Sequence, residues 1–349
     1  MTRRLFLAGL PLAAAIPPIR GLSRTNLLEY HDNGQVRIAT SRRQWESRRR
    51  EALDGMHQIT GPLPGKEKRV PLHIQIDQET DMGSYIRRAI TYASEPRSRT
   101  PAFLCIPKPA LAGKKARAVL CLHPTDNAAG YQVVVGLGGR PHRQYASELA
   151  ERGFVTISPS YPQLAQYQPD IEGLGYASGT MKAVWDNIRA LDILDSLPAV
   201  RKGQYGAIGH SLGGHNAIYT AVHDQRIKVI VSSCGFDSFL DYYGGNIKGW
   251  VQLRYMNRMS NYLGKPQDVP FDFYELLAAL APRPVFINAP LRDNNFAHAS
   301  VDRIRDAALP IYALYNAAPN IRVEHPDSEH DFPDPVRLAA YSFIDSKLG

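Results

Sequence analysis

Short runs of consecutive apolar residues recur along the chain from Ala118 onward, and stretches with helical periodicity lie between them. Uninterrupted apolar runs of this length are typical of strands buried on both faces of a parallel sheet. Strands that alternate with helices need crossovers, which place helices on both sides of the sheet. The pattern therefore predicts an α/β fold with a mostly parallel, doubly wound sheet flanked by helices. The expected strands cover residues 118–122, 154–157, 205–208, 227–231, 285–287 and 321–323, and the expected helices cover 145–151 and 181–197.

The chain before Ala118 has a different pattern. Residues 22–70 are polar and rich in arginine, with an amphipathic helix expected over 45–56 and a turn-rich linker at 61–65. Three strand-like runs follow, at residues 71–76, 85–92 and 102–106. We therefore expect a helical and linker extension over residues 22–70 and a main domain over residues 71–349.

One segment interrupts the alternation of strands and helices. Between Cys234 and Pro282 the chain is rich in aromatic residues and glycine, including Tyr242, Tyr243 and Trp250. A long insertion after a sheet strand is more often part of a functional site than an idle loop. We expect residues 236–280 to form a cap over such a site, and a purely structural insertion is the alternative.

The segment Gly209-His210-Ser211-Leu212-Gly213-Gly214 matches the pattern G-x-S-x-G. It lies directly after an expected strand and before an expected helix, which is the context that a nucleophilic serine on a sharp turn requires. Glycines flank the serine because side chains there would clash in such a tight turn. Ser211 is therefore the candidate nucleophile.

A serine hydroxyl needs a base to remove its proton, and an acid to orient that base. His330 lies in a loop between the last expected strand and helix, so it is the candidate base, with His325 as the alternative. Asp293 is the acid in the loop after the strand at 285–287, so it is the candidate acid. Asp237, which follows the preceding strand, is the alternative acid, whereas Asp331 is too close to His330 in sequence to reach its ring.

Two N–H donors are needed for the negatively charged oxygen of a tetrahedral intermediate. The first candidate is Leu212, which follows the nucleophile. The loop after Leu122 reads His123-Pro124-Thr125-Asp126, and proline has no N–H, so Thr125 is the second candidate. The alternative is that His123 and Pro124 only shape the turn.

Composition and charge narrow the choice of partners. The chain has 349 residues and a formal charge of +8, but its arginine clusters are short and interrupted, and no nucleic-acid-binding motif is present. We expect no nucleic-acid partner, and a weak attraction to acidic glycans stays open. The three cysteines lie in apolar runs without metal-ligand spacing, so we expect buried free thiols and no metal.

The first residues combine Arg3 and Arg4 with a short apolar run that ends in alanines near Ala15. A charged start followed by such a run is typical of an export signal, and the Thr-Arg-Arg-x-Phe-Leu string is similar to bacterial twin-arginine signals. The run is too short to span a bilayer. We therefore expect an export signal over residues 1–21, a periplasmic or secreted protein, and no stable membrane insertion.

With these residues assigned, the chain resembles the bacterial α/β-hydrolases grouped with dienelactone hydrolases and acetyl xylan esterases. The resemblance runs from about Pro71 to the C-terminus and is carried by residues 123–125, 209–214, 280–284 and 329–332. It implies the α/β-hydrolase fold with an eight-stranded sheet, a cap-like insertion after the sixth strand, and cofactor-free acyl transfer by a Ser-His-Asp triad. Dienelactone hydrolases carry cysteine at the position of Ser211, so the resemblance does not extend to their substrate.

These observations favour a secreted serine carboxylic-ester hydrolase that acts on a small-molecule or glycan ester, with acetyl esters of plant polysaccharides as one candidate. An exported peptidase of the prolyl-oligopeptidase type is the second hypothesis, although the chain has no room for a propeller domain. A catalytically silent binding protein is the third, and it conflicts with the presence of a candidate for every triad position.

Overall fold

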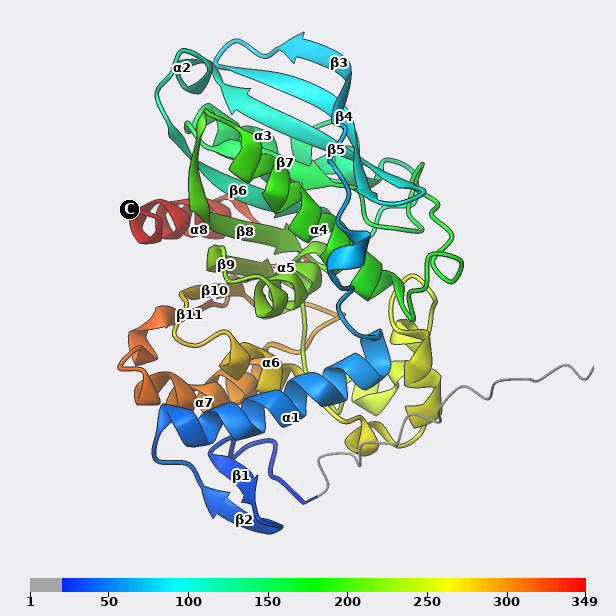
Figure 1. Cartoon of the computed structure of the whole chain (residues 1–349). Helices are drawn as coiled ribbons and strands as arrows, with labels where there is room; N and C mark the ends of the chain where they lie inside the picture. The colour runs from blue at the N-terminus through cyan, green and yellow to red at the C-terminus, as the bar shows by residue number, and fades with distance from the viewer. Residues whose placement is uncertain (1–20) are drawn as a thin grey trace, which may run out of the picture.

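The computed structural model describes residues 21–349 (Figure 1). The expected export signal therefore lies outside the described residues, except for Gly21. None of the helices in the described part combines the length and the apolar character needed to cross a membrane.

A nine-stranded sheet forms the centre of the molecule, in the spatial order β11-β10-β9-β8-β6-β7-β5-β4-β3. The strands from β6 to β11 are parallel to their neighbours, and β3, β4 and β5 form an antiparallel edge that joins the parallel part between β5 and β7. The predicted mostly parallel sheet is thus confirmed. Its strands are β3 (Gln75–Asp81), β4 (Tyr85–Glu95), β5 (Ser98–Pro107), β6 (Ala116–Leu122), β7 (Val155–Pro159), β8 (Val200–His210), β9 (Ile227–Ser233), β10 (Val285–Asn288) and β11 (Ile321–Glu324).

Two expectations about the sheet were wrong. The sheet has nine strands rather than the implied eight, so the insertion follows its seventh strand, β9, and not the sixth. The expected strand at residues 71–76 overlaps the actual strand β3 only at its first two residues. The polar sequence of β3 hides it from a search for apolar runs, and this polarity is tolerated because β3 is an edge strand with exposed side chains.

Helices cover both faces of the sheet, as predicted. One hydrophobic cluster joins α3 and α8 to one face, and the larger cluster joins α1, α4, α5, α6 and α7 to the other. A separate hairpin of β1 and β2 precedes α1 and was not predicted (Figure 1). These elements are β1 (Glu29–Asp32), β2 (Gln35–Ile38), α1 (Arg42–Thr60), α2 (Lys108–Leu111), α3 (Tyr145–Glu151), α4 (Gly179–Ser196), α5 (Leu212–His223), α6 (Phe273–Ala279), α7 (His298–Leu314) and α8 (Asp334–Lys347).

The insertion between β9 and α6 consists of short 3₁₀ helices around an aromatic core. Its backbone is joined to the start of α4, where the N–H of Gly179 donates to Leu253 O at 2.7 Å and that of Thr180 donates to Tyr255 O at 3.2 Å. A side chain at position 179 would place its Cβ 2.3 Å from Arg254 O, so glycine is needed for this contact. The insertion is therefore a packed part of the main domain.

The N-terminal extension packs against α6 through two ion pairs, and Figure 1 shows α1 lying along α6 and α7. Arg48 and Glu275 approach to 2.9 Å with both side chains almost completely buried, and Arg24 reaches Asp272 at 3.1 Å. Asp272 and Glu275 also form the capping box at the N-terminus of α6. The extension thus supplies the positive charges for two buried carboxylates of the main domain.

Arg48→Ala should lower the free energy of unfolding by about 3–5 kcal/mol, because it leaves the buried Glu275 carboxylate without a counter-charge. Urea unfolding followed by circular dichroism measures this change. The matched control is Lys108→Ala, which removes a surface ion pair with Asp81 and should cost less than about 1 kcal/mol. Equal effects of the two substitutions would show that the Arg48 pair does not hold the extension in place.

Candidate active site

Ser211 occupies a sharp turn between β8 and α5, which confirms the predicted strand–turn–helix context. Its φ of 55° and ψ of −121° are unfavourable for a residue with a side chain. The turn is so tight that a Cβ at Gly209 would lie 2.2 Å from Gly213 O, and a Cβ at Gly213 would lie 2.0 Å from Leu122 O. These close approaches hold the serine at the carboxyl edge of the sheet, where the hydroxyl is accessible.

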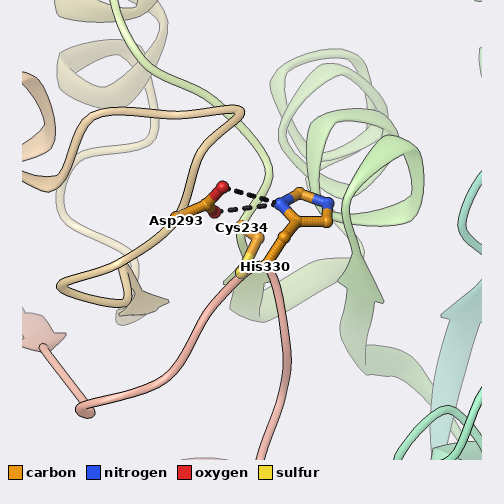
Figure 2. A group of neighbouring side chains, drawn as sticks. All are labelled: Cys234, Asp293 and His330. Carbon is orange, nitrogen blue, oxygen red and sulfur yellow. Dashed lines mark hydrogen bonds and ion pairs between the residues drawn. The ribbon is translucent and has the colours of Figure 1, made fainter.

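His330 and Asp293 face each other at the same edge of the sheet (Figure 2). Both carboxylate oxygens of Asp293 lie 2.9 Å from His330 Nδ1, and the Asp293 side chain is almost fully buried. Burial by itself would raise the pKa of Asp293. The hydrogen bond and charge of His330, with the N–H groups of Asn295 and Phe296, outweigh burial and lower that pKa. Asp293 is thus suited to orient the imidazole and to stabilise its protonated form.

A cavity of about 240 Å³ has Ser211 and His330 together in its wall. The structure therefore brings these two predicted residues to one space, and Asp293 stands behind the histidine. Thr125 lines the same cavity from the loop after β6. The remaining lining residues are Pro124, Asp126, Val133, Arg140, Arg143 and His210.

The alternative base and acid have other partners. His325 places Nδ1 2.7 Å from Ala289 O and Nε2 3.1 Å from Asp302, and it is not among the residues that line the cavity. Asp237 is buried and accepts the N–H of Ala297 at 3.1 Å through Oδ2, while its Oδ1 has no hydrogen-bond partner in the described chain. The geometry therefore favours His330 and Asp293 over these alternatives.

The His330 loop is fastened by contacts that the sequence analysis did not predict. Arg143 reaches Asp331 at 2.6 Å and His142 reaches it at 2.8 Å. Asn288 at the end of β10 donates to Asp331 O at 2.9 Å. Asp331 therefore anchors the loop instead of acting on the ring beside it, and its charge-assisted hydrogen bond with the buried Arg143 helps to keep His330 in place.

Cys234 lies beside the pair of His330 and Asp293 (Figure 2), and their three ligand atoms are within 4.8 Å of one another. Burial and the Asp293 charge raise the pKa of the Cys234 thiol well above its usual value. A protonated thiol is a poor metal ligand, because metals bind the thiolate. His330 Nδ1 is engaged by Asp293, so this cluster is better described as a hydrogen-bonded site than as a metal centre.

The candidate oxyanion donors are Leu212, which directly follows Ser211, and Thr125, which lines the cavity from the loop after β6. Leu212 is the first residue of α5, where the N–H has no partner within the helix. The buried His123 accepts the N–H of Tyr161 at Nε2 (2.8 Å) and places Nδ1 2.8 Å from Pro124 O, so it shapes the turn before Thr125. Burial lowers the pKa of His123 to about 4, so the ring is neutral.

Tyr255 of the insertion contacts the candidate donor Thr125, and this contact was not predicted. Its hydroxyl lies 3.1 Å from Thr125 Oγ1, and its ring packs against the cluster that contains Leu212. The adjacent Arg254 donates to Asn127 at 2.9 Å. The insertion therefore contacts the oxyanion side of the site directly, which is consistent with the predicted cap.

Comparisons with known proteins agree with this architecture. No family model matches the chain. YtaP of Bacillus subtilis (strain 168), which is named as a hydrolase, is 30% identical over 166 residues, or 47% of this chain and 53% of that protein. The chain spans about half the length of the curated relatives it matches.

Solved structures resemble the whole chain. A glucuronoyl esterase from Solibacter usitatus has a TM-score of 0.72 at 17% identity, with 97% of this chain and 100% of that chain covered. The chain has the α/β-hydrolase fold. An acetyl xylan esterase from Paenibacillus sp. R4 has a TM-score of 0.55 at 17% identity, with 88% of this hydrolase-fold chain and 96% of the other covered.

Asp293→Asn should reduce kcat for an ester substrate by about 10⁴-fold, because the amide favours the wrong tautomer of the candidate base His330. The matched control is Asp237→Asn, which changes the alternative acid. It should leave kcat within about threefold of the wild-type value, because Asp237 accepts the N–H of Ala297 and makes no hydrogen bond to His330 in the described chain. Steady-state kinetics with an aryl acetate measures both. A larger loss in the Asp237 variant would reverse the assignment of the acid.

The environment of Asp237 predicts that the stability of the protein depends on pH. Burial, followed by the negative charges of Asp241, Asp272 and Asp293, raises the pKa of Asp237 to about 8 in the folded state. Between its unfolded pKa near 4 and this value, only the unfolded state loses the proton, so the contribution of Asp237 to stability falls as pH rises. The Asp237→Asn variant has no titratable group at this position, so it lacks this pH-dependent contribution.

The melting temperature of the Asp237→Asn variant minus that of the wild type should therefore increase from pH 4.5 to pH 8. Thermal unfolding in buffers of equal ionic strength measures it. A difference that is constant across this range would show that Asp237 titrates normally.

Proposed function

We propose that this protein is an exported serine carboxylic-ester hydrolase that acts on carbohydrate esters. The observation that carries the proposal is the hydrogen-bonded pair of Asp293 and His330, which meets Ser211 at one cavity. This combination of a strained nucleophile turn, a histidine and a buried carboxylate is what acyl transfer requires.

In the proposed mechanism, His330 takes the proton of Ser211 as the serine attacks the ester carbonyl. Asp293 holds the ring in the required tautomer and stabilises its positive charge. The N–H groups of Leu212 and Thr125 donate hydrogen bonds to the oxyanion. His330 then gives the proton to the leaving alcohol, and a water molecule activated by the same histidine hydrolyses the acyl-enzyme.

Three observations support a carbohydrate ester as the substrate. Structures similar to this chain are named as glucuronoyl and acetyl xylan esterases. The cavity at Ser211 is lined mainly by polar and charged side chains, which suit a hydroxyl-rich ligand. The N-terminal residues have the pattern of an export signal, and polysaccharides are met outside the cytoplasm. We propose a periplasmic or secreted location on this basis.

Acetate release from acetylated xylan, measured beside hydrolysis of an aryl acetate, tests the proposal. The mature protein should release acetate from both, and Ser211→Ala should lower the rate by about 10⁴-fold or more. Cleavage of the aryl acetate alone would retain the triad and exclude xylan as the substrate. Activity on neither ester, together with no labelling of Ser211 by a fluorophosphonate, would contradict the proposed function.

A further inference from the structure

The loop that carries the candidate oxyanion donor Thr125 is fastened on both sides of that residue. Before it, His123 accepts the N–H of Tyr161 at 2.8 Å. After it, Asp126 accepts the N–H of Ala129 at 2.7 Å. Thr125 itself is exposed, and its N–H has no hydrogen-bond partner in the described chain. This N–H can therefore donate to a substrate oxygen, but few neighbours are available to fix its direction.

The side chain of Thr125 makes one hydrogen bond within the described residues, and its partner belongs to the insertion. The Tyr255 hydroxyl lies 3.1 Å from Thr125 Oγ1. The neighbouring Arg254 donates to Asn127 Oδ1 at 2.9 Å, so two consecutive residues of the insertion bind this loop. Thr125 lines the Ser211 cavity, whereas Tyr255 is not among its lining residues. The contact with Thr125 is therefore the route by which Tyr255 can influence the reaction.

Tyr255 is itself held by buried residues of the main domain. Its carbonyl oxygen accepts the N–H of the fully buried Thr180, at the start of α4, at 3.2 Å. Its ring packs near that of the buried Tyr161, with centroids 6.4 Å apart. The Tyr161 hydroxyl donates to Arg254 O at 2.8 Å, and the Tyr161 N–H is the group that His123 accepts. Tyr161 thus joins the insertion to the Thr125 loop by a second path, and the Tyr255 hydroxyl has a fixed position from which to bind Thr125.

An oxyanion donor is most effective when its N–H is already directed at the position that the developing charge will occupy. An exposed loop residue that could turn away would lose part of this stabilisation. We propose that Tyr255 is a positioning residue for the oxyanion site: its hydroxyl holds Thr125 so that the N–H of Thr125 points toward the carbonyl oxygen at Ser211. This inference rests on the proposed ester hydrolysis and gives the insertion a part in its rate.

Tyr255→Phe tests the inference, because it removes the hydroxyl and keeps the ring. Complete loss of an oxyanion donor costs about 10²- to 10³-fold in kcat, so a donor that is retained but poorly directed should cost about 10-fold. KM for an aryl acetate should stay within about twofold of the wild-type value, because the weakened interaction is made in the transition state. The matched control is Tyr262→Phe, since Tyr262 is a tyrosine of the insertion that lines a separate cavity beside Arg24. It should leave both constants unchanged.

A trifluoromethyl ketone analogue of the ester separates positioning of the donor from a general loss of structure. Ser211 Oγ forms a bond to the ketone carbon, the π electrons of the carbonyl move to its oxygen, and the serine proton passes to His330. The adduct therefore carries the oxyanion of the tetrahedral intermediate. Its inhibition constant should rise in Tyr255→Phe by the factor by which kcat/KM falls, and should not change in Tyr262→Phe.

Substitutions at Thr125 test the other partner of the contact. Thr125→Val keeps the branched shape and the N–H but removes the hydroxyl, so it should lower kcat by about 10-fold, as Tyr255→Phe does. The double variant should be within about twofold of either single variant, because both substitutions remove the same contact. Thr125→Ser retains a hydroxyl and should keep kcat within about threefold of the wild-type value.

Three results would overturn the inference while Ser211-dependent hydrolysis is retained. The first is an unchanged kcat in Tyr255→Phe. The second is a raised KM with an unchanged kcat, which would indicate a role in substrate binding. The third is a loss of about 100-fold in the double variant, which would show that Tyr255 acts independently of Thr125. Absence of ester hydrolysis by the wild type would instead overturn the proposed function, and this inference with it.

Discussion

The close approach of three backbone segments around Ser211 is the constraint on which the site depends. Gly209 and Gly213 allow the end of β8, the start of α5 and the end of β6 to approach more closely than side chains permit. The serine takes a strained conformation as a result, and a core of parallel strands and helices holds it there. The loops after β10 and β11 end at the same edge of the sheet, so the parallel arrangement also brings Asp293 and His330 toward the serine.

This constraint explains which features could be predicted from the sequence. Apolar runs that are largely buried mark the central strands from β6 to β10. The glycine pattern around Ser211 can be read within a few consecutive residues. The positions of Asp293 and His330 then follow from the order of strands and loops. The polar edge strand β3 and the hairpin strand β2 lack such a signal, because their side chains are largely exposed, and β1 is only four residues long. Exposed strands show little of the alternation on which prediction depends.

The contacts made by the insertion could not be predicted, because they join residues that are distant in the sequence. The composition of residues 236–280 predicts a cap, but it does not reveal that Tyr255 meets Thr125 or that Trp250 stacks on His215. These pairings depend on how the aromatic core of the insertion packs against α4 and α5. The same holds for the arginine that anchors the His330 loop, since Arg143 and Asp331 are separated by 188 positions.

The ion pairs between the N-terminal extension and α6 have a consequence for the timing of folding. Arg48 and Glu275 are 227 positions apart, so a ribosome must complete most of the chain before they can meet. Until then the capping box of α6 has no counter-charge, and the extension has no surface on which to dock. Bringing together residues so far apart in the sequence costs conformational entropy, and no stabilising contact offsets this cost until the two residues meet. The extension is therefore among the last segments to reach its native position, although it precedes the main domain in the chain, and it docks only after α6 is in place.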